Sequence, residues 1–339
     1  MPNTENTDTP HDMKFHQLAA ILITCVFTPE IHADVTADSL SMRTGMTDWA
    51  DPVHATVPGT HYVTYPPPSR GEGTEGSCLV YLPAGYGTDT TKRYPVIYYL
   101  HGGTGNQREV GWLVERLDRA IADRLMDPVI VVSPQALPIG WYVNANTSDP
   151  KVLSGPVEDV VINDLIPFID SSYNTVAAPS GRGIEGFSMG GRGALNLAFS
   201  HPGLFGAVSS VAGAVVDWDE EPLQRALECT FGDMDDEFSR TYFDAWHPRT
   251  AAIRNARRII GNGMKVRMFV GDRDRLHEEN GNHITARFGE LLRRLGIHHT
   301  LTVVPGASHD PRQIFDPAVN PYDWTFWQSA FSAPASIPD

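Results

Sequence analysis

Short apolar segments alternate with helical patterns of ten to fifteen residues from about residue 78 to the end of the chain. The strands that this alternation predicts are residues 78–82, 96–100, 129–132, 182–186, 207–211, 265–270 and 299–304. Several of them are apolar without interruption, which is typical of a parallel sheet that is covered on both faces. The pattern therefore predicts an α/β fold with a mostly parallel central sheet and helices on both faces.

Composition along the chain indicates how this fold is organised. Residues 34–76 are rich in Pro, Gly, Ser and Thr, which predicts an irregular lead-in with edge strands such as residues 61–65. Residues 77–339 contain neither a Gly/Ser linker nor a repeat, so we expect a single domain. Inside it, residues 214–262 interrupt the alternation with clustered acids and a basic helix, and we expect an insertion there, packed over one end of the sheet. A helix predicted at 157–169 contains Pro167, which should bend it.

The first 33 residues differ from the rest of the chain. A polar stretch, residues 1–12, precedes Lys14, an apolar run at 18–27 and a small residue, Ala33. This layout is typical of a secretory signal peptide at about residues 13–33 behind an upstream extension, and it predicts a secreted or periplasmic protein. A buried helix or a disordered tail is the alternative. Loss of the signal would leave two cysteines, Cys78 and Cys229, either paired or free.

The net charge of the chain limits the kinds of molecule that we expect it to bind. The 26 Lys and Arg residues against 41 Asp and Glu residues give a formal charge of −15. Such a surface repels phosphate backbones, which argues against nucleic-acid binding. No stretch of 18 or more apolar residues is present, so we expect no integral membrane association. The oligomeric state stays open.

One short motif indicates nucleophilic catalysis. The segment Gly-Phe-Ser-Met-Gly-Gly, residues 186–191, lies between the strand predicted at 182–186 and a helix predicted at 190–200. A serine hydroxyl is a weak nucleophile, and it must be exposed on a tight turn beside a base. Glycines on both sides of Ser188 allow such a turn, and the free amides of the helix can stabilise an oxyanion. The motif predicts Ser188 as a nucleophile.

A base and an acid are expected in the loops that follow later strands, because the carboxyl ends of parallel strands meet at one edge of the sheet. Asp272 and Asp274 follow the strand predicted at 265–270, and His309 follows the last predicted strand. We predict His309 as the general base and Asp274 as the carboxylate that orients it. Asp272 is the alternative acid.

An oxyanion hole requires two backbone amides. The residue after the nucleophile, Met189, should supply one, and the loop His-Gly-Gly-Thr-Gly at 101–105 should supply the other, because glycines allow close approach to a substrate. We predict Gly103 and Met189 as the donors, with Thr104 as the alternative to Gly103. The sequence contains no C-x-x-C, H-E-x-x-H or calcium-loop motif, so we expect neither a metal nor a cofactor.

Five motifs occur in the order that is typical of one known family. They are VYLPAGY at 80–86, YPVIYYLHG at 94–102, ED-x4-DLIP at 158–167, GFSMGG at 186–191 and HP-x-LF at 201–205. Over roughly residues 60–331 the chain therefore resembles the esterase branch of the α/β-hydrolase superfamily, which includes feruloyl esterases, acetylxylan esterases, esterase D and the mycolyltransferases. The resemblance implies the α/β-hydrolase fold, with Ser188 as nucleophile, Asp274 as acid, His309 as base and Met189 as an oxyanion donor.

The residues and the resemblance together predict a secreted serine carboxylesterase that works through an acyl-enzyme on Ser188. The resemblance favours feruloyl or acetyl esters of plant cell-wall polysaccharide as substrates. Two alternatives stay open: an acyltransferase that moves the acyl group to a sugar or lipid alcohol, and a non-catalytic binding module on a hydrolase scaffold.

Two segments depart from the family pattern, residues 138–144 and residues 214–262. The candidate substrate-binding residues are three aromatic side chains in these segments and one residue of the glycine-rich loop: Trp141, Tyr142, Trp218 and Thr104. Tryptophans buried in the core are the alternative interpretation of the aromatic residues.

Overall fold

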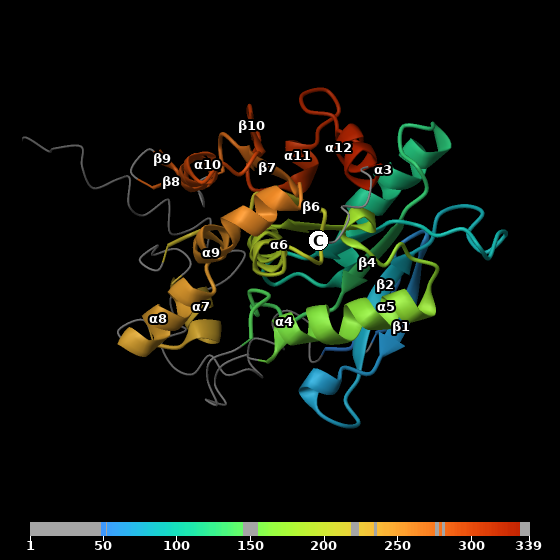
Figure 1. Cartoon of the computed structure of the whole chain (residues 1–339), viewed down its shortest axis with the longest axis horizontal. Helices are drawn as coiled ribbons and strands as arrows, with labels where there is room; N and C mark the ends of the chain where they lie inside the picture. Colours follow the sequence, from blue (N-terminus) through green and yellow to red (C-terminus); the bar gives the residue numbers. More distant parts are fainter. Residues whose placement is uncertain are drawn as a thin grey trace, which may run out of the picture.

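The apolar segments of the chain form one eight-stranded sheet in the computed structural model (Figure 1). The structure describes residues 49–51, 53–144, 155–217, 224–233, 236–274, 278–279 and 282–332. In order across the sheet, the strands are β1 (Thr60–Tyr65), β2 (Gly76–Tyr81), β4 (Ile130–Pro134), β3 (Val96–Leu100), β5 (Arg182–Phe187), β6 (Ala207–Val211), β7 (Lys265–Gly271) and β10 (Thr300–Val304). The β1–β2 and β2–β4 pairs are antiparallel, and all neighbours from β4 to β10 are parallel. A separate short ribbon pairs β8 (Glu278–Glu279) with β9 (Asn282–His283).

Helices cover both faces of this sheet. They are η1 (Pro68–Arg70), η2 (Gln107–Val110), α3 (Gly111–Ala122), α4 (Val157–Asp159), η3 (Val160–Leu165), α5 (Ile166–Ser172), η4 (Pro179–Gly181), α6 (Met189–Ser200), α7 (Gln224–Phe231), α8 (Glu237–Ala245), α9 (Pro248–Gly261), α10 (Ile284–Arg294), α11 (Pro311–Ile314) and α12 (Thr325–Phe331). One apolar cluster joins α3, α11 and α12 to one face, and a second joins α5, α6, α9 and α10 to the other. The predicted fold class is confirmed.

Strand β3 shows why its sequence has no polar alternation. Tyr98 and Leu100 belong to the cluster on one face, whereas Ile97 and Tyr99 belong to the cluster on the other. Because successive side chains of a strand point to opposite faces, a sheet covered on both sides requires apolar residues at every position. All five residues of β3 are buried.

The helix predicted at 157–169 is present but irregular. It begins as α4, continues through the π-helical segment η3 and ends as α5 at Ser172. Pro167 is the second residue after the π-helical segment, and it lacks the amide hydrogen that a regular helix needs at this position. Wide π turns are one way in which a helix accommodates such a break in its hydrogen bonding.

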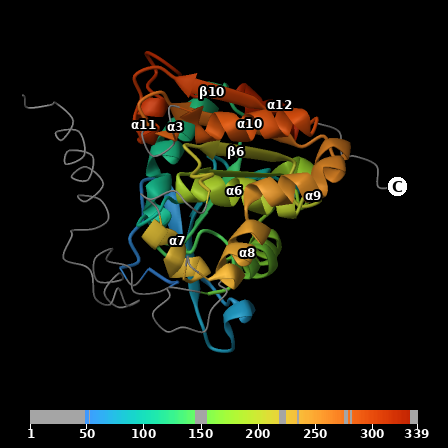
Figure 2. The same ribbon diagram turned by 90° about the vertical axis from the view of Figure 1, so that its left-hand side faces the viewer.

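Three helices, α7, α8 and α9, occupy most of the segment in which the sequence interrupts the alternation. Helix α9 connects β6 to β7 and packs against α6, and the two helices lie side by side in Figures 1 and 2. It is therefore an ordinary crossover helix of the sheet. Within this segment, the described helices that depart from the strand–helix alternation are α7 and α8, which contact each other.

Several sequence-based expectations concern residues outside those described, including the upstream extension, the signal peptide at about 13–33 and the first part of the lead-in, residues 34–48. In the part of the chain that the structure does describe, no helix combines the length and apolar character needed to cross a membrane. Cys78 is a free thiol buried in β2, and burial raises its pKa. The side chain of Cys229 lies outside the described set.

Candidate active site

Ser188 occupies the sharp turn between β5 and α6. Its backbone is left-handed, with φ 55° and ψ −118°, a conformation that is unfavourable for a residue with a side chain. Hydrogen bonds to β6 and to the loop that follows β6 stabilise this turn. The Ser188 amide donates to the carbonyl of Val211 at 2.9 Å, and the Ser188 carbonyl accepts from the amide of Ala214 at 3.1 Å. These hydrogen bonds offset the backbone strain and present the hydroxyl at the carboxyl edge of the sheet.

The glycines beside Ser188 are required by close packing. A Cβ atom on Gly186 would lie 2.2 Å from the carbonyl oxygen of Gly190, and one on Gly190 would lie 2.0 Å from the carbonyl oxygen of Leu100. Both distances are far shorter than any non-bonded contact allows. The sequence pattern G-x-S-x-G therefore follows from the approach of α6 to β3 and β5.

His309 bridges Ser188 and Asp274. Its Nε2 atom lies 2.8 Å from the Ser188 Oγ atom, and its Nδ1 atom lies 2.7 Å from the Asp274 Oδ2 atom. The Asp274 side chain is fully buried, and the His309 side chain is 22% exposed. A carboxylate can only accept, so Nδ1–H donates to Asp274 and leaves Nε2 to accept from the serine hydroxyl. The ring of Phe187 packs against the imidazole with centroids 4.8 Å apart.

Asp272 has a different environment. It is exposed, and its Oδ1 atom accepts a hydrogen bond from the amide of Gly306 at 2.7 Å. This contact ties the loop after β7 to the loop after β10. Of the two acids that the sequence left open, the structure brings Asp274 to His309.

Two amides lie where an oxyanion hole would form. The amide of Met189 is at the first position of α6, where no residue of the helix can accept from it. A Cβ atom on Gly103 would be 3.9 Å from the Met189 Cβ atom, so the glycine-rich loop approaches the start of the helix closely. The Thr104 amide already donates to the carbonyl of Pro138 at 2.7 Å, whereas the Gly103 amide has no acceptor among the described residues. Gly103 and Met189 therefore have amides that are free to bind an oxyanion.

Two of the aromatic residues that were predicted to bind substrate, Trp141 and Tyr142, are buried. Trp141 is 2% exposed and Tyr142 is fully buried, so neither presents a surface to a substrate in this structure. The Tyr142 hydroxyl donates to the His101 carbonyl at 3.1 Å, and its ring fills the space beside Gly193 of α6. Both aromatic residues act as core supports of the site. Trp218 lies outside the described residues.

His101 stabilises the glycine-rich loop through hydrogen bonds at both nitrogen atoms of its ring. It is fully buried, its Nδ1 atom donates to the Gly102 carbonyl at 2.8 Å, and its Nε2 atom accepts from the Ala136 amide at 3.3 Å. Burial lowers the pKa of His101 to about 4, although the hydrogen bond to the Gly102 carbonyl partly opposes the shift. The imidazole is therefore neutral at ordinary pH and holds the loop in place.

Glu109, which no sequence motif indicated, lies in η2 shortly after this loop. Both oxygens of its carboxylate accept from the Gly102 amide, at 3.1 and 3.2 Å. Burial raises the pKa of Glu109 to about 7, against the lowering effects of the Gly102 amide, the Tyr99 hydroxyl and His309. The only available signal was the position of an acid shortly after a glycine-rich loop, which is too common a feature to indicate a role.

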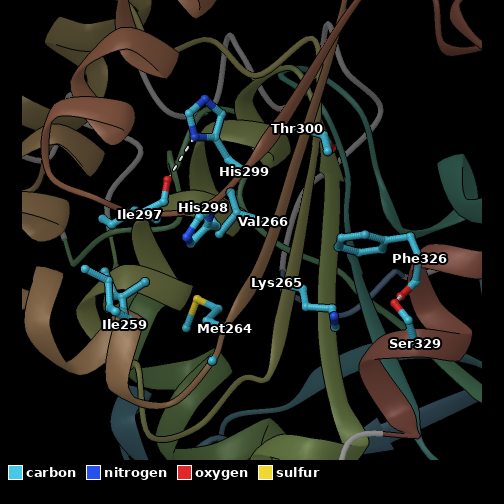
Figure 3. A pocket seen from close by; sticks show the side chains of 12 residues that line it. Ile259, Met264, Lys265, Val266, Ile297, His298, His299, Thr300, Phe326 and Ser329 are labelled. Atoms are coloured by element: carbon cyan, nitrogen blue, oxygen red, sulfur yellow. Dashed lines mark hydrogen bonds between the residues drawn. The ribbon is translucent and has the colours of Figure 1, made fainter.

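A hollow lies at the opposite edge of the sheet, where β7 and β10 begin (Figure 3). It has a volume of about 490 Å³ and is lined by side chains from α9, the starts of β7 and β10, and α12. His299 is one of them, and its Nδ1 atom bonds to the carbonyl of Ile297 at 3.0 Å. None of the residues discussed above lines it. Within the described ranges, no three His, Cys, Asp or Glu side chains gather as a metal site would require.

The sheet topology and the sharp turn at Ser188 define the class of the protein, which is that of the α/β-hydrolase fold. The profile of the esterase family, described as "Putative esterase", matches residues 69–334. The chain belongs to this family, which confirms the resemblance inferred from the sequence motifs.

Two relatives that are named as esterases are much longer than the segment that they share with this chain. Esterase Rv1288 of Mycobacterium tuberculosis is 37% identical over 139 residues, which cover 40% of this chain and 28% of that protein. An endo-1,4-beta-xylanase/feruloyl esterase of Xylanibacter ruminicola is 32% identical over 171 residues, covering 48% of this chain and 23% of that protein. The chain thus matches only about a quarter of the length of either relative.

Solved structures support the fold. The S-formylglutathione hydrolase of Agrobacterium tumefaciens superposes with a TM-score of 0.58 at 20% identity. The superposition covers 80% of this chain and 93% of that structure.

Proposed function

We propose that this protein hydrolyses carboxylic esters with Ser188 as nucleophile, His309 as general base and Asp274 as the carboxylate that orients the imidazole. The observation that carries the proposal is the continuous pair of hydrogen bonds from Ser188 through His309 to Asp274, at 2.8 and 2.7 Å. Nucleophile, base and orienting acid in such contact are what acyl transfer through serine requires.

The geometry supports a two-step reaction. His309 takes the proton of the Ser188 hydroxyl at Nε2 while Oγ attacks the ester carbonyl carbon. The carbonyl oxygen becomes an oxyanion, and the amides of Gly103 and Met189 bind it. The protonated imidazole then gives its proton to the leaving alcohol, and an acyl-enzyme remains. Water, deprotonated by His309, attacks the acyl-enzyme and releases the acid.

Feruloyl or acetyl esters of plant cell-wall polysaccharide are the proposed substrates, and the proposed location is outside the cytoplasm. Support for the substrate class comes from the relative that combines a xylanase with a feruloyl esterase. Support for export comes from the pattern at residues 13–33. A polymer is too large to enter a cell, so an enzyme that acts on cell-wall esters has to be exported.

The test is Ser188→Ala measured beside the unchanged protein on p-nitrophenyl acetate, methyl ferulate and acetylated xylan. We expect hydrolysis by the unchanged protein and a loss of about 10,000-fold or more in the variant, because no other group can form the acyl-enzyme. Ser329→Ala is a matched control, since Ser329 is an exposed serine at the opposite edge of the sheet. Circular dichroism spectra of the variants establish that both are folded.

The same experiment separates the other candidate functions. Full activity in Ser188→Ala would contradict the assignment of the nucleophile. An unchanged protein that binds the esters without hydrolysing any of them would be a binding module. When an acceptor alcohol is added, a dominant transfer product would identify an acyltransferase in place of a hydrolase.

A further inference from the structure

Glu109 is a charged side chain at the candidate active site that the proposed reaction does not use. Besides its two contacts with the Gly102 amide, its Oε1 atom accepts from the Tyr99 hydroxyl at 3.0 Å. That hydroxyl in turn accepts from the indole nitrogen of Trp112 at 2.9 Å. The carboxylate therefore connects β3 and α3, both parts of the rigid scaffold, to the glycine-rich loop.

The loop fits around this carboxylate with little free space. A Cβ atom on Gly105 would lie 2.6 Å from the Glu109 Oε2 atom, so the carboxylate occupies the space that a side chain at position 105 would need. A Cβ atom on Gly102 would lie 3.4 Å from the Ser188 Cβ atom and 3.5 Å from the Glu109 Oε2 atom. Gly102 is thus packed closely against both Ser188 and Glu109. Any movement of Gly102 is passed directly to the next residue, Gly103.

The inference rests on the proposed function: we propose that Glu109 is a positioning residue that fixes Gly102 and thereby directs the Gly103 amide at the substrate oxyanion. A hydrogen bond to an ionised carboxylate is shorter and stronger than one between neutral groups, which suits it to holding a glycine-rich segment still. An oxyanion-hole donor contributes fully only when it is already aimed at the developing charge. Displacement by about 1 Å is enough to lower a rate strongly.

The ionisation of Glu109 gives this role a pH dependence. The titratable groups that face the carboxylate are Tyr99 of β3, His101 of the loop, Tyr142 and His309. Burial raises the pKa of both tyrosines and lowers the pKa of His101, so these three are neutral near pH 7. Because the pKa of Glu109 is raised to about 7, its charge is present above that pH and is lost as the pH falls through it. Positioning of the loop should weaken in the same range.

The experiment compares Glu109→Ala and Glu109→Gln with the unchanged protein, using p-nitrophenyl acetate between about pH 5 and pH 9. Alanine removes the acceptor, and we expect kcat to fall about 10- to 100-fold with KM little changed, because only the transition state uses the oxyanion donors. Glutamine retains an acceptor oxygen without the charge, so kcat of Glu109→Gln should lie between those of Glu109→Ala and the unchanged protein. Because glutamine does not titrate, the acid limb of the pH profile of this variant should lack one ionisation. Glu115→Gln, an exposed acid on α3 paired with Arg119, is the matched control and should behave as the unchanged protein.

The possible results are distinct. A Glu109→Ala variant with the kcat of the unchanged protein overturns the inference, and so does one in which only KM rises. If either Glu109 variant fails to fold, Gly105→Ala decides, because its new methyl group displaces the same carboxylate from the loop side. A lowered kcat in folded Gly105→Ala supports the inference, and an unaltered kcat refutes it. If the unchanged protein hydrolyses no ester, or Ser188→Ala is fully active, the proposed function itself has failed.

Discussion

The two edges of the central sheet offer a direct comparison. The edge where β3, β4, β5 and β6 end contains five of the seven non-glycine residues of the described chain that have a positive φ: Thr104, Trp141, Tyr142, Ser188 and Ala212. The opposite edge, where β7 and β10 begin, has a hollow of about 490 Å³ lined largely by apolar side chains. No non-glycine residue with a positive φ lines that hollow. Among the described residues, non-glycine backbone strain therefore occurs mainly at the carboxyl edge and is absent from the lining of this hollow.

The difference shows what distinguishes a reactive site from a cavity. A left-handed non-glycine residue is costly and persists only where surrounding contacts hold it, as they hold Ser188. At the carboxyl edge those contacts place a hydroxyl, an imidazole and a carboxylate in one hydrogen-bonded series. At the amino edge, the Nδ1 atom of the His299 ring bonds to the carbonyl of Ile297, two residues earlier in the chain.

The strongest test of the comparison exchanges the two histidines for alanine in separate variants. His309→Ala should lower kcat by about 10,000-fold or more, because Ser188 then has no base. His299→Ala should leave kcat within about twofold, since this side chain lies at the far edge of the sheet. Steady-state kinetics on p-nitrophenyl acetate measures both. Equal losses in the two variants would contradict the separation of the edges.

A second test compares the two acids after β7. Asp274→Asn should lower kcat by about 1,000- to 10,000-fold, because an amide no longer holds the imidazole in the orientation and tautomer that accept the serine proton. Asp272→Asn should change kcat by about tenfold at most, through the contact of Asp272 with the Gly306 amide. If Asp272→Asn proves the more damaging change, the assignment of the orienting acid is reversed.

The smallest expected effect concerns stability, and it compares two glycines. Gly190→Ala places a methyl group 2.0 Å from the carbonyl oxygen of Leu100, and should lower the free energy of unfolding by more than about 3 kcal/mol. Gly261→Ala at the end of α9 meets nothing within 4 Å, and should change stability by less than about 1 kcal/mol. Urea unfolding followed by circular dichroism measures the difference. Equal stabilities would mean that the serine turn is less tightly packed than the structure indicates.

Much of the fold could be predicted from the sequence, because a strand buried on both faces needs an unbroken apolar sequence. Strands β3 and β6 agree with the predicted segments residue for residue, and β1 lies at the edge of the sheet as expected. Helix boundaries were harder to predict. The helix predicted at 157–169 ends three residues later, at Ser172, and the π-helical turns before Pro167 had no separate signal. The role of α9 as a crossover helix depends on its contact with α6, which the sequence does not show.

The sequence by itself determined the strand–turn–helix around Ser188 and the edge at which His309 and the two acids would meet. Both follow from local rules, since glycines define the turn and parallel strands end together. Only the tertiary structure placed Asp274, and not Asp272, against His309, and gave the Thr104 amide an acceptor in the Pro138 carbonyl. The tertiary structure also buried Trp141 and Tyr142 and placed Glu109 against Gly102. Each of those outcomes depends on the distance between atoms far apart in the chain, and such distances are set by packing of the whole domain, which no local pattern encodes.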